Sequence, residues 1–182
     1  MRSSDTPLAG LKLIELRLHA DARGFFTERF NAQRYGAHGL PEHFVQDNHS
    51  RSLPGVLRGL HYQNTPAQGK LVGVIHGRVW DVAVDIRPGS ATFGQHYAVE
   101  LSGDNGRMLW IPEGFAHGFC VLSQAPADMV YKVTTPYNPQ GEGAIRDDDP
   151  ALAIDWPLKE PLISERDQNL PSWEEYTTGI AK

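Results

Sequence analysis

Apolar residues in this chain alternate with polar ones over short runs, and turn-forming residues separate these runs. Alternation with a period of two is typical of half-buried β-strands, because successive side chains point to opposite faces. The pattern predicts strands over residues 11–18, 25–30, 55–63, 70–75, 77–86, 97–101, 108–111, 118–122 and 129–134. It also predicts a short helix within 31–40, helical turns within 165–176, and otherwise loops from residue 136 onward. Many short strands with regular turn signals indicate an all-β sandwich or barrel, formed by one domain over residues 1–182.

Residues 55–63, GVLRGLHYQ, place an arginine and a histidine in a strand of mostly apolar side chains. Burying either without partners is costly, so an inward orientation would need a functional reason. Arg58 and His61 are three positions apart and would point to opposite faces of a regular strand. A bulge at Gly59 would bring both to one cavity, since glycine tolerates the distorted backbone. On these residues alone, an arginine in solvent and a hydrogen-bonded core histidine are an equal alternative.

Two further polar patterns stand beside apolar strands. In residues 79–86, VWDVAVDI, Asp81 and Asp85 fall on the face opposite the large apolar side chains. This pattern indicates either a solvated face or partners for an inward lysine or arginine. The run Gln46-Asp47-Asn48 precedes the 55–63 strand and suits either a capped turn or the recognition of a polar heterocycle.

Composition excludes several classes of protein. Hydrophobic residues make up 40% and charged residues 21% of the 182, as in soluble globular proteins with a sizeable core. A net charge of -5 gives no electrostatic footprint for nucleic acid. No apolar run is long enough for a membrane span or for the core of a signal peptide. Cys120 is the only cysteine, so an intrachain disulfide is impossible and a cytoplasmic location is expected.

Residues 106–117, GRMLWIPEGFAH, have the spacing Gly-x5-Pro-x-Gly-x2-His. This is identified as the second motif of the cupin superfamily, whose members are double-stranded β-helix (jelly-roll) barrels, and Gly55 to His61 resembles the start of the first motif. The metal-binding form continues with a second histidine and a glutamate, where this chain has Gln63 and then Ala67 or Gln68. Of four expected ligands only His61 and His117 remain, too few for a closed first-row metal site. The resemblance implies a jelly roll with no metal and no organic cofactor.

Eight ordered motifs between about residues 11 and 171 are more specific. They are RGFFTERF, FVQDNHSRS, VLRGLHYQ, QGKLV, GRVWDVAVDIRPGSATFG, LWIPEGFAHGF, YKVTTPYNPQGEG and SERD. Together they resemble the dTDP-4-dehydrorhamnose 3,5-epimerase family. The resemblance implies a nucleotide-linked 4-keto-6-deoxyhexose as substrate, with C3 and C5 epimerised by proton abstraction next to the C4 ketone.

The resemblance also implies catalytic roles. His61 matches the general base, and imidazole has the unperturbed pKa for that task. Asp167 matches the carboxylate that orients it, Lys70 the group at the enolate oxygen, and Tyr131 the acid on the opposite ring face. Without the resemblance, these three would be interpreted as a turn cap, a surface lysine and a half-buried strand tyrosine.

Substrate-binding positions follow in the same way. Those matching contacts to the diphosphate or the adjacent sugar are Arg23, Arg58 and His117. Those matching positions around the thymidine and the substrate are Glu28, Gln46, Asp47, Asn48, Tyr137, which would stack on the base, and Glu142. Three residues depart from the family pattern: Arg166, where lysine is common; Gly73, where arginine is common; and Pro136, where a second tyrosine is common.

The family pairs barrels and exchanges N-terminal strands, so a homodimer is expected in which residues 23–28 complete the partner's site. Three other functions stay open: an epimerase of C3 alone or C5 alone, a non-catalytic sugar-binding cupin, and, more distantly, a metal-dependent cupin oxygenase. A base, an enolate-stabilising lysine and an opposing acid argue against a binding module, which needs none of them. The choice between one and two epimerised carbons is not encoded in any motif.

Overall fold

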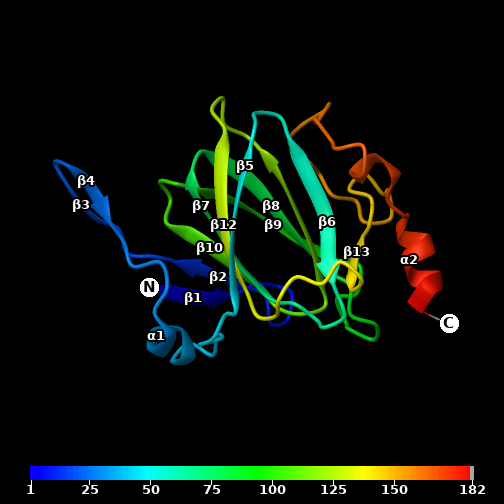
Figure 1. The fold of residues 1–182 in the computed structure, drawn as a ribbon, viewed down its shortest axis with the longest axis horizontal. Coiled ribbons are helices and arrows are strands. Elements are labelled where there is room, and N and C mark those ends of the chain that lie inside the picture. Colours follow the sequence, from blue (N-terminus) through cyan, green and yellow to red (C-terminus); the bar gives the residue numbers. More distant parts are fainter. Residues whose placement is uncertain (181–182) are drawn as a thin grey trace.

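The computed structural model describes residues 1–180, which form two facing β-sheets with short helical segments outside them (Figure 1). The helices are α1 (Ala32–Gly36), the single 3-10 turn η1 (Asp167–Asn169) and α2 (Trp173–Ile180). The strands are β1 (Arg2–Asp5), β2 (Lys12–Glu15), β3 (His19–Asp21), β4 (Gly24–Phe26), β5 (Gln46–Ser52), β6 (Leu57–Gln63), β7 (Lys70–His76), β8 (Arg78–Asp85), β9 (His96–Ser102), β10 (Arg107–Ile111), β11 (Phe115–Val121), β12 (Ala127–Val133) and β13 (Glu142–Ala144).

The sheets have the order β1-β2-β10-β7-β12-β5 and β13-β6-β11-β8-β9, and β3 and β4 form a separate hairpin. All pairings between these strands are antiparallel. The two large sheets face each other without closing into a cylinder, as in a jelly roll. The predicted all-β jelly-roll fold is therefore confirmed.

Alternation along β8 shows how the sequence divides its side chains between the two faces of a sheet. Val79 and Ala83 belong to the core between the sheets, whereas Val82 and Val84 pack outward against the C-terminal segment. Asp81 and Asp85 share the inner face and are fully buried. Asp85 pairs with Arg87, as one alternative expected, whereas Asp81 pairs with His117 and not with a lysine or arginine. The solvated-face alternative is wrong for both carboxylates.

Segments outside the sheets cover their outer faces. Around α1, Tyr35 and Leu40 pack on the outer face of the six-stranded sheet. Trp173 and Tyr176 of α2 pack on the outer face of the five-stranded sheet, and α2 lies at that end of the molecule in Figure 1. Across residues 1–180, no helix is both long and apolar enough to span a membrane.

Several strand predictions needed correction. The predicted strand over 25–30 is wrong beyond Phe26, because β4 pairs only with β3 and the chain then turns so that Phe30 packs on Tyr35 and Phe44. The strand predicted over 11–18 is limited to β2. Strands β1, β3, β5 and β13 were not predicted: β1 and β13 are short edge strands, β3 is a three-residue strand that pairs with β4, and β5 is polar along its whole length. Pairing with a neighbouring strand, which alternation cannot reveal, holds them in place.

Candidate active site

Strand β6 contains the bulge expected at Gly59. His61 lies opposite His117 of β11 and Arg58 opposite Phe119, so two residues of β6 face Gly118 alone. Gly59 has a φ of +115°, and a Cβ atom there would lie 2.6 Å from the Cα of Gly118. Only glycine fits this close approach. The bulge brings Arg58 and His61 to one cavity, which confirms the parity argument.

That cavity has a volume of about 160 Å³ and lies between the sheets. Strands β6 and β11 contribute from the five-stranded sheet, and β5, β7 and β12 contribute from the six-stranded sheet. Its walls are Ser50, Arg58, His61, Lys70, His117, Gly118, Phe119, Met129 and Tyr131. The prediction that five functional side chains share one cavity is confirmed, whereas their chemical roles stay predictions.

The carboxylate of Asp167, in η1, lies within hydrogen-bond distance of the imidazole of His61. Its Oδ1 lies 3.0 Å from Nε2 of His61, and its Oδ2 accepts a hydrogen bond from the backbone N–H of Gly59 at 3.4 Å. The carboxylate is buried, so it is not the turn cap that the residue type alone would suggest. Burial lowers the pKa of His61 below its usual 6.5, and the charge of Asp167 opposes this only in part. With a proton on Nε2, the imidazole is neutral near pH 7 and Nδ1 is free to accept a proton.

Lys70 brings a cation with free N–H donors into the cavity. Its Nζ donates weakly to the carbonyl oxygen of His61, at 3.4 Å. Within residues 1–180 it forms no ion pair with a carboxylate. Burial lowers the pKa of Lys70 to about 8. The ammonium therefore remains mostly protonated near pH 7 and can donate to an oxyanion.

Tyr131 lies on β12, in the sheet that faces β6 across the cavity. Burial raises the pKa of its hydroxyl, which keeps the group protonated at neutral pH. A basic imidazole on one sheet and a phenolic acid on the other can act on opposite faces of a ring held between them.

A second buried histidine–carboxylate pair was missed by sequence reasoning. Nε2 of His117 lies 2.9 Å from Oδ2 of Asp81, while Oδ1 of Asp81 is buried without a partner among the described residues. The negative charge of Asp81 also acts on Lys70, where it opposes the effect of burial on the pKa. The inward parity of Asp81 signalled a partner, but the sequence did not show that this partner would be His117.

A chain of hydrogen bonds joins five of the predicted binding residues. Glu142 accepts hydrogen bonds from the hydroxyl of Tyr137 at 3.0 Å and from the guanidinium of Arg166 at 2.8 Å. Gln46 accepts from the backbone N–H of Tyr137 at 3.0 Å and donates to Asn48 at 2.8 Å. These bonds hold the exposed ring of Tyr137 by its hydroxyl and by its backbone.

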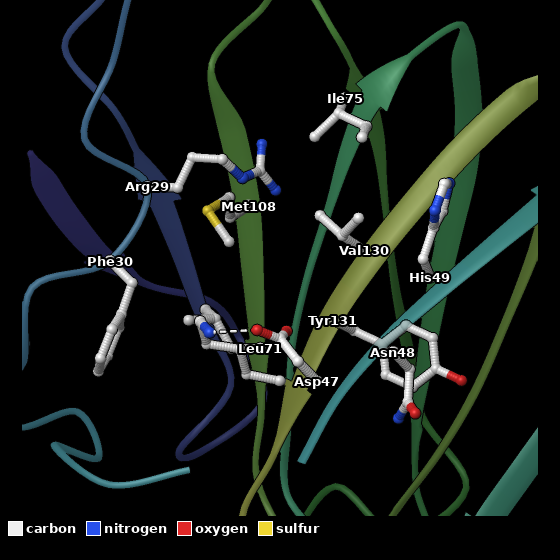
Figure 2. A pocket seen from close by; sticks show the side chains of 11 residues that line it. Arg29, Phe30, Asp47, Asn48, His49, Leu71, Ile75, Met108, Val130 and Tyr131 are labelled. Atoms are coloured by element: carbon white, nitrogen blue, oxygen red, sulfur yellow. Dashed lines mark hydrogen bonds and ion pairs between the residues drawn. The ribbon is translucent and has the colours of Figure 1, made fainter. Parts of the chain in front are cut away.

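Of the ten predicted binding residues, Arg58 and His117 line the cavity, and five others form the hydrogen bonds around Tyr137. The remaining three belong to neither group. Arg23 lies in the projecting β3–β4 hairpin and pairs with Asp21, and Glu28 pairs with Arg34. Asp47 lies on the outer face of the six-stranded sheet, where Figure 2 shows its ion pair, formed with Lys132. Their roles in binding stay predictions.

The outer-face pocket drawn in Figure 2 has a volume of about 440 Å³, and two of its lining residues, Arg29 and Met108, lie next to Gly73. Arg29 extends along this face, and a Cβ atom at Gly73 would lie 2.8 Å from its Nη2. A side chain at position 73 would require this guanidinium and the side chain of Met108 to shift, so the glycine leaves room for Arg29 in its present position. Nη2 of Arg29 is buried and has no hydrogen-bond partner among residues 1–180.

Within residues 1–180, no three His, Cys, Asp or Glu side chains are grouped so that they could hold a metal ion. His61 and His117 each direct Nε2 to a carboxylate instead.

Comparison with known proteins agrees with this site. Residues 5–175 match the family described as dTDP-4-dehydrorhamnose 3,5-epimerase. The Pseudomonas aeruginosa protein of that name is 52% identical over 170 residues, which cover 92% of this chain and 93% of the relative. The Neisseria gonorrhoeae protein of that name is 51% identical over 170 residues, and the match covers 93% of this chain but only 52% of that longer relative.

Solved structures are also similar. The 3,5-epimerase of Legionella pneumophila, in complex with dTDP-4-keto-L-rhamnose, is 54% identical with a TM-score of 0.90, covering 94% of this chain and 92% of that one. A 4-keto-6-deoxy sugar epimerase from Streptomyces spheroides is 36% identical with a TM-score of 0.94, covering 99% and 91%. The chain belongs to the dTDP-4-dehydrorhamnose 3,5-epimerase family, whose members are isomerases.

Proposed function

We propose that this chain epimerises dTDP-4-dehydro-6-deoxy-D-glucose at C3 and C5, giving dTDP-4-dehydro-L-rhamnose. The observation that carries the proposal is the His61–Asp167 pair on one wall of the cavity, with Tyr131 on the other wall and Lys70 beside them. Solvent deuterium incorporated at both C3 and C5 during turnover would test it.

Each inversion moves one proton off the ring and one proton on. Nδ1 of His61 accepts the proton from the carbon next to the ketone, and Asp167 stabilises the resulting imidazolium. Lys70 donates a hydrogen bond to the enolate oxygen, in a cavity where desolvation strengthens that interaction. Tyr131 then delivers its hydroxyl proton to the opposite face of the carbon. Solvent exchange reprotonates Tyr131 and deprotonates His61 before the second carbon reacts.

The nucleotide half of the substrate carries a diphosphate and a flat base. We assign Arg58 and His117 to the diphosphate and the adjacent sugar, and Tyr137 to stacking on the base. The Bacillus anthracis 3,5-epimerase, 42% identical over 94% of this chain, was solved with TDP bound. Gln46, Asn48, Glu142 and Arg166 support this half of the site through the bonds that they form with Tyr137 and with each other.

A homodimer completes the site in this proposal. The β3–β4 hairpin projects from the chain and leaves the side chains of Phe25 and Phe26 49% and 70% exposed, which favours a protein partner (Figure 1). Arg23 and Glu28 on this segment then reach the partner's cavity, and the enzyme acts in the cytoplasm without metal or organic cofactor. Full activity from a species that sediments as a monomer at micromolar concentration would contradict the dimer. A stoichiometric metal whose chelation abolishes turnover would contradict the metal-free mechanism.

The alternative is an epimerase that acts on one carbon. A 3'-monoepimerase from Streptomyces bikiniensis has a TM-score of 0.87 but is only 32% identical to this chain, whereas 3,5-epimerases reach about 50%. Identity therefore favours epimerisation at both carbons. Deuterium at C3 alone or C5 alone would support the alternative.

A further inference from the structure

Arg58 lines the cavity, and its guanidinium donates hydrogen bonds to neutral groups. Its Nε donates to Oγ of Ser52 at 2.9 Å, and its Nη2 reaches the backbone carbonyl oxygen of Arg51 at 3.5 Å. Within residues 1–180 it forms no ion pair with a carboxylate. Its positive charge is therefore available to an anion that enters the cavity.

Ser52 is the last residue of β5, and its side chain faces the same way as that of Ser50, which lines the cavity two positions earlier. It is only 2% exposed, and its hydroxyl has no hydrogen-bond partner other than Arg58 within the described part of the chain. A buried hydroxyl is costly unless it forms a hydrogen bond. The contact with Arg58 accounts for this serine.

Strand β5 is fixed at this end from its other face. Asp128 of β12 lies opposite Arg51 in the sheet register. Its carboxylate accepts two hydrogen bonds from Arg51, both at 2.8 Å, and lies 2.9 Å from Nε2 of His49. A two-pronged arginine–carboxylate contact restricts both partners. The contacts of Arg51 and His49 with Asp128 thus fix the part of the β5 backbone that places Oγ of Ser52 and the carbonyl oxygen of Arg51 next to Arg58.

We propose that Ser52 is a positioning residue for diphosphate binding: by accepting Nε–H, it fixes the Arg58 guanidinium so that its remaining N–H donors face the substrate. The inference rests on the proposed contact between Arg58 and the diphosphate. Arginine carries several rotatable bonds, so a guanidinium that is fixed before binding loses less freedom when the anion arrives.

Calorimetric titration with dTDP tests the proposal on full-length wild type, Ser52→Ala, Ser52→Thr, Arg58→Met and the double variant Ser52→Ala/Arg58→Met. Loss of one hydrogen bond predicts that Ser52→Ala weakens dTDP binding about three- to tenfold. KM should rise by a similar factor while kcat changes by less than about twofold, and Ser52→Thr should restore affinity because it keeps the hydroxyl. In the Arg58→Met background, Ser52→Ala should have no further effect.

The outcomes distinguish the proposed contact of Arg58 with the diphosphate from the proposed positioning of Arg58 by Ser52. If Arg58→Met binds dTDP as tightly as wild type, the diphosphate role of Arg58 is wrong. If Arg58→Met weakens binding but Ser52→Ala does not, or if the effect of Ser52→Ala persists without Arg58, the positioning role is wrong. Nitrogen-15 NMR spectra of the wild type give a further test that needs no substitution at Ser52. The Nε–H signal of Arg58 is assigned as the one that disappears in Arg58→Met. In wild type this hydrogen should exchange slowly with solvent, and fast exchange would also overturn the positioning role.

Discussion

Nε2 of His61 and Oδ1 of Asp167 lie 3.0 Å apart although 106 positions separate the two residues in the chain. One residue lies in β6 and the other in a single 3-10 turn near the C-terminus. The C-terminal segment is therefore part of the catalytic machinery in this account, and not only a cover for the five-stranded sheet.

Replacing Asp167 by asparagine should slow turnover while leaving the cavity intact. The negative charge of Asp167 raises the pKa of His61 against the effect of burial, so its removal lowers that pKa further. A less basic imidazole is a weaker proton acceptor, and the imidazolium loses its counter-ion. We expect kcat to fall by roughly a hundredfold or more. The acid limb of the pH–rate profile should move to lower pH, and an acid limb that stays in place would contradict the coupling.

The pH profile of the wild type should report Lys70 on its alkaline side. The pKa of Lys70 is about 8, and only the protonated ammonium can stabilise an enolate oxygen by charge and hydrogen bonding. Activity should thus fall as pH rises through about 8. Lys70→Arg provides the matched control, because a guanidinium keeps its proton throughout this range. Any residual activity of Lys70→Arg should lack that alkaline limb.

Burial of the protonated Lys70 should also lower the free energy of unfolding of the wild type. Its folded-state pKa of about 8 lies below the usual 10.5, so at neutral pH the protonated lysine destabilises the folded chain. Lys70→Met should increase the free energy of unfolding by up to roughly 3 kcal/mol at pH 7 while abolishing most turnover. The gain should shrink between about pH 8 and 10.5, where the folded wild type loses its proton first. Denaturant titrations at pH 7 and pH 10 check this, and a gain independent of pH would argue against charge burial as the cause.

Gly59→Ala should be strongly destabilising. The added methyl would lie 2.6 Å from the Cα of Gly118 and 2.7 Å from the carbonyl oxygen of His117, at a φ that side chains rarely adopt. We expect a loss of about 2–4 kcal/mol in the free energy of unfolding.

Gly55→Ala is the matched control, since Gly55 also has a positive φ, +78°, but open space around its Cβ position. It should cost only about 1–2 kcal/mol, the backbone contribution alone. Equal losses in the two variants would contradict the role assigned to the close approach at the bulge.

The sequence predicted local features better than long-range ones. Alternation located β6, β7, β8 and β12, and the spacing of Arg58 and His61 predicted a bulge that the structure contains. The pairing of Asp167 with His61 came from the family resemblance alone, because no local pattern joins a C-terminal turn to a central strand. The polar strand β5 and the His117–Asp81 pair depend on neighbours that only the fold brings into contact.

The most direct test of the account follows the ring protons of dTDP-4-keto-6-deoxy-D-glucose by NMR in deuterated water. Wild type should incorporate deuterium at C3 and C5 and form dTDP-4-dehydro-L-rhamnose, the product with the L-lyxo configuration. His61→Ala should slow exchange at both carbons by roughly a hundred- to ten-thousandfold. Tyr131→Phe keeps the base and Lys70, so proton washout should persist while inversion falls. Tight binding of the nucleotide sugar by wild type with no exchange at either carbon would contradict the account and indicate a binding protein instead.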